Sequence, residues 1–164
     1  MADVPRKVRR ARPDDAGAIG NFIARATRGR LAVPYEDVVE RLGSKAYFLV
    51  TAEQIVGLAG WRAENLVCRV EDFVVFPGTE RITAGRALLE QIEKEARKLE
   101  CEALLIFVPM STAKATVVFF ESIGFMRRLP DDIPAPWQQA ADEFLGGYHF
   151  FMVKQLRELV MKPI

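Results

Sequence analysis

The residues best suited to bind a charged ligand lie between Val74 and Leu89, in the stretch VVFPGTERITAGRALL. A β-branched run ends at Pro77, a short polar loop follows, and an amphipathic helix is expected from Ala84 onwards. The first turn of a helix carries backbone N–H groups without intrahelical partners, and the helix dipole favours negative charge there. The stretch therefore predicts an anion-binding site at the start of a helix.

Side chains in this stretch act both for and against a bound anion. Thr83 is interpreted as the helix N-cap, although its hydroxyl could instead hydrogen-bond a phosphate. Glu80 adds negative charge that salt would partly screen, and Arg81 and Arg86 could compensate for it. Because the helix dipole disfavours a cation at Arg86, a bound anion there would resolve the conflict. The alternative is an Arg86 side chain that simply points to solvent.

The rest of the sequence predicts strands and helices that alternate along the chain. Strands are expected at residues 8–12, 46–51, 55–61, 66–76, 103–108, from 125, and at 148–156. Helices are expected after 13–15, from 34, from 84, at about 112–123 and at 137–145. This order predicts an α/β or α+β fold with helices on both faces of a central sheet.

Further predictions concern single residues and one short segment. Gly43 is expected to end the second helix, and Leu99 to lie on the buried face of the long helix. Trp61, Arg62, Glu64 and Asn65 are expected to form a polar link between two strands. That link is either an exposed turn or one wall of a cleft.

Length and composition predict a soluble globular protein with one domain over residues 1–164. Half of the residues are hydrophobic, and the formal net charge of +1 gives no reason to expect a nucleic-acid partner. The N-terminus is nevertheless locally basic. Its run is interpreted as a solvated strand edge rather than a binding arm, and it comprises Arg6, Lys7, Arg9, Arg10 and Arg12.

Cysteine and histidine content predicts neither a disulfide nor a metal site. Cys68 and Cys101 each lie in an apolar segment, which predicts buried free thiols in a reducing compartment. The single His149 makes no metal-ligand spacing with them. No signal peptide is visible and no apolar run approaches the ~20 residues that span a bilayer, so a cytoplasmic location without membrane contact is expected.

Two motifs resemble those of the GNAT family of N-acetyltransferases. In the first, Val75-Phe76-Pro77 precedes the loop and Gly85-Arg86-Ala87-Leu88-Leu89 follows it at the family's spacing. Inside the loop, Glu80 stands where the family usually has arginine or glutamine, and Thr83 stands where it has its first glycine. In the second, Phe119-Phe120-Glu121-Ser122-Ile123-Gly124-Phe125 resembles the ending of the helix after strand five. The order of elements resembles the family along nearly the whole chain. It implies a GNAT-like mixed, mostly antiparallel sheet with helices on both faces.

The resemblance implies an N-acetyltransferase that uses acetyl-coenzyme A as co-substrate and a small-molecule or peptide amine as acceptor. The amine would attack the thioester directly, while a backbone N–H near Val75 polarises the carbonyl oxygen. Backbone amides of the loop and helix start would hold the pyrophosphate, and the candidates are Arg81, Ile82, Thr83, Ala84, Gly85 and Arg86.

The resemblance also implies a carboxylate base on strand 66–76 or close to it, and Glu71 is preferred to Asp72 and Glu64. Strand alternation places Glu71 with Arg69 and Phe73 on one face and Asp72 on the other. Arg69 could therefore hold Glu71 in a structural ion pair instead.

Departures from the family pattern bear on catalysis. Many members have a tyrosine at Phe120, which protonates the coenzyme A thiolate, and an asparagine at Ala113. Tyr148 could replace the missing acid, with core packing as the alternative role. These departures support a rival interpretation, a GNAT-like domain that binds an acyl-coenzyme A as a sensor or interaction module. The segment from Trp137 to Phe144 could form a substrate lid or a homodimer contact.

Overall fold

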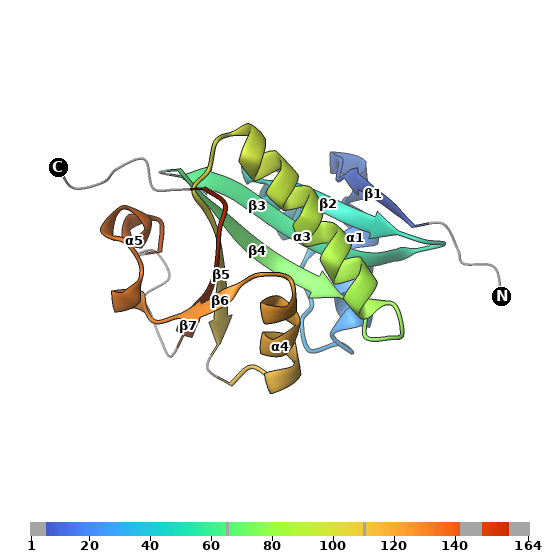
Figure 1. Ribbon diagram of the computed structural model, residues 1–164. Helices are drawn as coiled ribbons and strands as arrows, with labels where there is room; N and C mark the ends of the chain where they lie inside the picture. The colour runs from blue at the N-terminus through green and yellow to red at the C-terminus, as the bar shows by residue number, and fades with distance from the viewer. Residues whose placement is uncertain (1–5, 65, 110, 142–148, 158–164) are drawn as a thin grey trace. The chain divides into compact units, whose positions relative to one another are not determined.

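The computed structural model describes residues 6–64, 66–109, 111–141 and 149–157. In chain order its strands are β1 (Lys7–Arg10), β2 (Ala46–Thr51), β3 (Ile55–Glu64), β4 (Val67–Val75), β5 (Ala103–Pro109), β6 (Met126–Arg128) and β7 (His149–Gln155). Its helices are α1 (Ala16–Ala26), α2 (Tyr35–Ser44), α3 (Arg81–Lys98), α4 (Lys114–Ser122) and α5 (Ala135–Ala141), with short 3-10 turns η1 (Pro13–Asp15) and η2 (Pro130–Asp132) (Figure 1).

The strands form one mixed sheet in the order β1-β2-β3-β4-β5-β7-β6. The pairs β1–β2, β2–β3, β5–β7 and β6–β7 are antiparallel. β4 and β5 run parallel, with Val67 opposite Ala103 and Val70 opposite Ile106. Parallel neighbours need a long crossover, and α3 provides it between these two strands. The predicted mixed, mostly antiparallel sheet is confirmed.

The internal contacts of the chain divide it into two units. Unit 1 comprises Met1–Trp61 and Asp72–Ile92, and unit 2 comprises Arg62–Glu71 and Glu93–Ile164. The division crosses β4 between Glu71 and Asp72, so the two carboxylates at this point of the sequence belong to different units.

Unit 1 has helices on both faces of β2 and β3. Leu49 and Leu58 are buried against apolar residues of α1 and α2. Gly57 precedes Leu58 and so faces the other side of the sheet. A Cβ atom at Gly57 would lie 3.0 Å from the Leu88 side chain of α3. α1 and α3 thus cover opposite faces of these strands, as Figure 1 shows.

Unit 2 has a core of its own, built from β4, β5, β7 and α5. Phe107 and Phe151 meet edge to face with ring centroids 4.5 Å apart. Trp137, considered above for a lid or a dimer contact, is 3% exposed and belongs to this core. α4 ends next to Gly124, as predicted, because Gly124 adopts φ +100° and the Phe125 N–H donates to the Phe120 carbonyl at 3.1 Å.

Several predicted boundaries and orientations are wrong. α2 runs through Gly43 to its end at Ser44, so Gly43 does not terminate that helix. β3 continues to Glu64, which makes Trp61 to Glu64 part of a strand rather than a polar link. Asn65 lies outside the described residues. Leu99 is 53% exposed because α3 ends one residue before it.

Candidate functional site

The first turn of α3 starts earlier than predicted. The helix begins at Arg81, and the Ala84 N–H already donates to the Glu80 carbonyl at 2.9 Å. Thr83 is therefore the third residue of the helix and not its N-cap. Gly85 and Arg86, at the fifth and sixth positions, use their N–H groups inside the helical ladder.

This start leaves open backbone donors on a different subset of residues. Within the part of the chain that the structure describes, the N–H groups of Ile82 and Thr83 have no hydrogen-bond partner. The Arg81 N–H makes a long contact of 3.3 Å with the Gly78 carbonyl. The side chains of Arg81, in this turn, and of Arg86, in the next turn, are exposed. Two open amides and two guanidinium groups are thus available to an anion.

Glu80, whose negative charge opposes a bound anion at this turn, forms an ion pair with Arg6. Arg6 Nη2 lies 3.0 Å from Glu80 Oε1, and Arg6 Nε donates to Oε2 at 3.4 Å. The hydrogen bond from Arg6 lowers the pKa of Glu80 below its usual value. The pair therefore offsets much of the negative charge next to the open turn.

The end of β4 has a free edge at Val75. The Phe76 N–H donates to the Val56 carbonyl of β3 at 2.9 Å. Because successive N–H groups of a strand point to opposite edges, the Val75 N–H points away from β3. The pairing of β4 with β5 covers Val67 to Val70 and does not reach Val75. This amide can therefore donate to a bound group.

Asp72 interrupts the regular alternation of β4. Its φ of +51° lies in the left-handed region, which residues other than glycine, asparagine and aspartate rarely adopt. Alternation predicted that Asp72 and Phe73 face opposite sides of the sheet. Instead Asp72, Phe73 and Val74 all line one pocket. The left-handed residue rotates the strand locally, as a β-bulge does.

The pocket has a volume of about 210 Å³ and lies within unit 1. Apolar side chains of α1, α2, their connecting loop, β3 and β4 form most of its wall, among them Ile19, Leu31, Val33, Leu42 and Phe73. The polar groups of the lining are Arg41, Asp72 and the phenol of Tyr47.

Asp72 is the centre of a compact polar cluster at this pocket, which we call the pocket cluster: Arg41, Lys45, Tyr47 and Asp72. The Tyr47 hydroxyl donates to Asp72 Oδ2 at 2.5 Å, and Lys45 Nζ lies 3.4 Å from the same oxygen. Arg41 Nη1 lies 3.5 Å from Oδ1. The ring of Tyr47 lies against Gly60 of β3, so a Cβ atom at position 60 would lie only 2.8 Å from the Tyr47 ring.

Glu71, the preferred base, lies in a different polar cluster within unit 2, which we call the strand cluster: Arg62, Glu64, Arg69 and Glu71. Arg69 is 1% exposed, and its Nη2 lies 3.4 Å from Glu64 Oε2 and 3.5 Å from Glu71 Oε1. Arg62 Nε lies 3.4 Å from the same Glu71 oxygen. The ion pair between Arg69 and Glu71 is present, and none of the four residues lines the pocket.

The helix motif around Phe120 is packed rather than polar. Phe120 is 3% exposed, and its ring lies 5.4 Å from that of Phe119 and 5.9 Å from that of Phe125. Ala113 directly precedes α4. Tyr148, the alternative acid, lies outside the described residues.

The two thiols are buried and free, as predicted. Burial raises the pKa of both Cys68 and Cys101 above the usual value, so both stay protonated at neutral pH. Among the described residues, no group of three or more histidine, cysteine or acidic side chains is arranged to hold a metal ion. A search of the same residues finds no helix with the length and apolar character needed to cross a bilayer.

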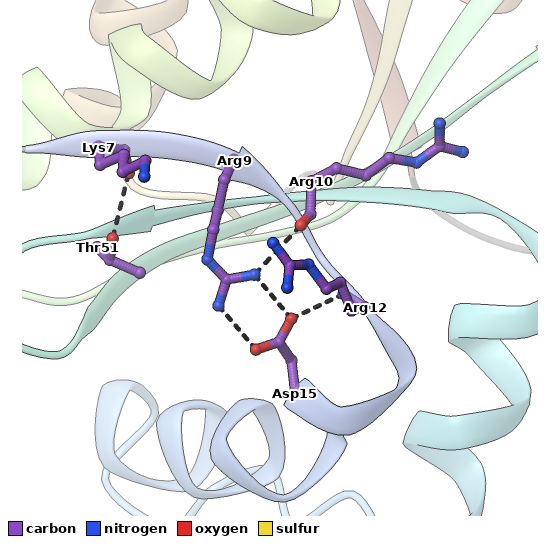
Figure 2. Close-up of polar contacts among 6 residues, drawn as sticks. All are labelled: Lys7, Arg9, Arg10, Arg12, Asp15 and Thr51. Atoms are coloured by element: carbon purple, nitrogen blue, oxygen red, sulfur yellow. Dashed lines mark hydrogen bonds and ion pairs between the residues drawn. The ribbon is translucent and has the colours of Figure 1, made fainter.

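Part of the basic N-terminal run serves the local structure. Arg9 makes a two-pronged pair with Asp15, at 2.8 Å from Nη1 to Oδ2 and 2.7 Å from Nη2 to Oδ1 (Figure 2). The Arg12 N–H donates to the same carboxylate at 2.7 Å. Hydrogen bonding within the pair raises the pKa of Arg9 and lowers that of Asp15. Arg10 points away from this group in Figure 2.

A family profile described as an acetyltransferase (GNAT) domain matches residues 24–132. The chain belongs to the GNAT family. No curated protein matches it in sequence. Sequence reasoning thus identified the family from the stretch after β4 and the end of α4. It missed the pocket cluster, because Lys45, Tyr47 and Asp72 are far apart in the sequence and carry no shared motif.

Solved structures of other GNAT proteins share the fold. A GNAT-family acetyltransferase from Staphylococcus aureus Mu50 has a TM-score of 0.74 at 14% identity, over 93% of this chain and 100% of that one. The PaiA N-acetyltransferase of Thermoplasma acidophilum, solved with coenzyme A, has a TM-score of 0.71 at 13% identity, over 93% and 99%. The ribosomal-protein-S18-alanine N-acetyltransferase of Escherichia coli has a TM-score of 0.66 at 18% identity, over 96% and 99%.

Proposed function

We propose that this GNAT protein is an N-acetyltransferase that moves an acetyl group from acetyl-coenzyme A to an amine. The observation that carries the proposal is the open first turn of α3, which directly follows a strand end with a free Val75 amide. The PaiA structure, solved with coenzyme A, supports the choice of co-substrate. Two buried, protonated thiols agree with a reducing, cytoplasmic setting.

Each group of the site has a role in this proposal. The amides of Ile82 and Thr83 donate to the pyrophosphate, and the guanidinium groups of Arg81 and Arg86 add positive charge. Ala84 and Gly85 are buried and shape the turn from within. The Val75 N–H donates to the thioester oxygen, where negative charge develops as the amine attacks.

The transfer forms one bond and breaks another. The neutral amine nitrogen attacks the thioester carbon, the new C–N bond forms, and the C–S bond breaks with release of the coenzyme A thiolate. The acylated nitrogen then loses a proton to solvent, which gives the neutral amide. Because Phe120 has no proton to give, solvent protonates that thiolate. The amine must first lose a proton from its ammonium form, and this step needs a carboxylate or water.

Glu71 is our proposed proton acceptor, and Asp72 is the second candidate because it lines the pocket. Arg62 and Arg69 compete with an ammonium for the lone pairs of Glu71, whereas Asp72 accepts a hydrogen bond from Tyr47. Glu71→Gln and Asp72→Asn separate the two candidates. Loss of the base lowers kcat by about 10²-fold to 10⁴-fold and leaves the affinity for coenzyme A unchanged. If neither variant changes kcat, water accepts the proton.

Thermal unfolding with and without acetyl-coenzyme A tests the co-substrate. At a hundredfold excess over Kd, a ligand of the native state adds about 2.7 kcal/mol to the free energy of unfolding. Arg86→Ala reduces this stabilisation, whereas the exposed Arg10→Ala on β1 serves as a matched control and leaves it unchanged. No shift at millimolar acetyl-coenzyme A would refute the proposal.

A second candidate function is an acyl-coenzyme A sensor without catalysis. The apolar packing of Phe120 and the alanine at position 113 favour it. Stabilisation by acetyl-coenzyme A without turnover of any amine in a broad panel would select the sensor.

A further inference from the structure

We infer that the acceptor is a primary monoamine with an apolar body about the size of one ring or a short alkyl chain, held in the pocket of unit 1. The inference rests on the proposed acetyltransferase function and narrows its acceptor, which neither the sequence nor the family defines. It excludes polyamines and amino sugars as the preferred substrates.

The size of the pocket sets the size of the amine. Its volume is about 210 Å³. An apolar cavity of about 150 Å³ holds a benzene ring, so this pocket has room for one ring with a short side arm or for a chain of similar length. A disaccharide or a long polyamine would have to leave part of its atoms outside, whereas a monosaccharide is disfavoured by the wall rather than by size.

The chemistry of the wall sets the character of the amine. Leu31, Val33, Leu42 and Phe73 offer apolar contact and no hydrogen bond. Burying a hydroxyl or a second ammonium against them costs free energy, because each polar group would lose water without gaining a partner. An alkyl or aryl body gains free energy instead.

The pocket cluster works against polycations. Asp72, the carboxylate of the lining, already accepts the Tyr47 hydroxyl and lies within 3.5 Å of both Lys45 and Arg41. The Asp72 carboxylate is thus already engaged by two cations and a hydroxyl. A second ammonium of a polyamine would have to compete with Lys45 and Arg41 for it, whereas an apolar body needs no such partner.

The pocket also includes the residues that directly precede Val75, the proposed contact of the thioester. Asp72, Phe73 and Val74 form part of its wall, and the next residue is Val75, whose free amide is proposed to hold the thioester oxygen. An amine whose body fills the pocket can therefore present its nitrogen to this end of β4. Leu31 lines the pocket although it is 54% exposed, which keeps the rim of the pocket apolar.

A series of primary amines tests the inference at saturating acetyl-coenzyme A. From propylamine to hexylamine, kcat/KM rises about fourfold for each methylene, the factor that corresponds to burial of one CH₂, and it levels off once the pocket is full. 2-Phenylethylamine is acetylated with a higher kcat/KM than spermidine or glucosamine. A flat series, or a preference for spermidine or glucosamine, would overturn the inference and leave the acetyltransferase function standing.

Two matched variants locate the effect. Leu31→Trp fills the pocket from its exposed loop, where the fold tolerates a larger side chain, and reduces kcat/KM for hexylamine at least tenfold while leaving propylamine nearly unchanged. Val39→Trp adds the same indole to an exposed position of α2 outside the lining and changes neither value. Equal behaviour of the two variants would refute the pocket as the binding site.

If no amine is acetylated, the proposed function fails and binding alone decides the inference. 2-Phenylethylamine then raises the melting temperature of the coenzyme A-loaded protein, and Leu31→Trp abolishes that shift. Absence of any shift at millimolar amine would overturn the inference independently of turnover.

Discussion

The strand cluster and the pocket cluster are centred on consecutive carboxylates, yet their surroundings differ. In the strand cluster, Glu71 and Glu64 face two arginines, one of which is 1% exposed. In the pocket cluster, Asp72 faces a lysine, an arginine and a phenol beside a cavity. The left-handed backbone of Asp72 marks the point where the chain passes from one cluster to the other.

This difference separates a carboxylate held between two arginines from one that lines a cavity. A charge buried with balanced partners stabilises the fold only as long as every partner is present. A carboxylate beside a cavity can be altered with less damage to the fold and more effect on what the cavity accepts. Acidic residues that are adjacent in a sequence therefore need not share a function.

The largest effect on stability is expected from Arg69→Met. Removal of the buried guanidinium leaves Glu71 and Glu64 with one cation fewer, at a cost of about 3–5 kcal/mol in the free energy of unfolding. Chemical denaturation measures this loss. The double variant Arg69→Met with Glu71→Gln recovers part of it, since the uncompensated charge is gone. A loss below 1 kcal/mol would show that the strand cluster is not structural.

Asp72→Ala is expected to lower the free energy of unfolding by about 2 kcal/mol. It leaves the Tyr47 hydroxyl without its acceptor and retains a Cβ in the left-handed region. Asp72→Gly loses the same carboxylate but relieves the backbone, so it is more stable than Asp72→Ala by about 1 kcal/mol. Equal unfolding free energies of the two variants would contradict the left-handed geometry.

Asp15→Asn weakens an ion pair that lies outside both clusters and so serves as a reference. It is expected to lower the free energy of unfolding by about 1 kcal/mol at neutral pH. The pair with Arg9 lowers the pKa of Asp15 from 3.8, so its stabilisation is complete above that value and is lost as the pH falls through the lower folded pKa. Unfolding measured from pH 7 to pH 2 shows a gap between wild type and variant that closes in acid. A gap independent of pH would contradict this assignment.

The smallest effect is expected at the exposed pair near α3. Glu80→Gln removes negative charge next to the open turn and tightens coenzyme A binding, whereas Arg6→Ala weakens it. Both changes shrink as ionic strength rises, because salt screens exposed charges. Titration calorimetry at low and high salt measures them. An unchanged affinity in both variants would place the pyrophosphate elsewhere.

Local patterns predicted the scaffold well where one signal dominated. β2 at Ala46–Thr51 and the glycine-terminated end of α4 follow from an apolar run and from Gly124. The start of α3 was misjudged because Thr83 is a good N-cap by type, although the Glu80 carbonyl already accepts the first helical hydrogen bond. Gly43 shows the converse error, since α2 continues one residue past a glycine, the residue type that usually ends a helix.

The site was harder to predict than the fold. The resemblance pointed to a turn that does have open amides, but which amides stay open depends on a helix start that shifts by three residues. The alternation rule also assumed regular β geometry, and the positive φ of Asp72 cannot be deduced from residue type alone. Pocket walls drawn from two helices, their connecting loop and three strands leave no local pattern.

The close approach of Tyr47 to Gly60 limits the order in which this pocket can be remodelled. Any side chain at position 60 would collide with the Tyr47 ring, whose nearest atom would lie 2.8 Å from the new Cβ. A smaller residue at position 47 must therefore come first, and it would enlarge the cavity and release Asp72 at the same time. Directed evolution toward bulkier acceptors is expected to change Tyr47 first. Changes at Gly60 are expected only in variants that already carry a smaller residue at position 47.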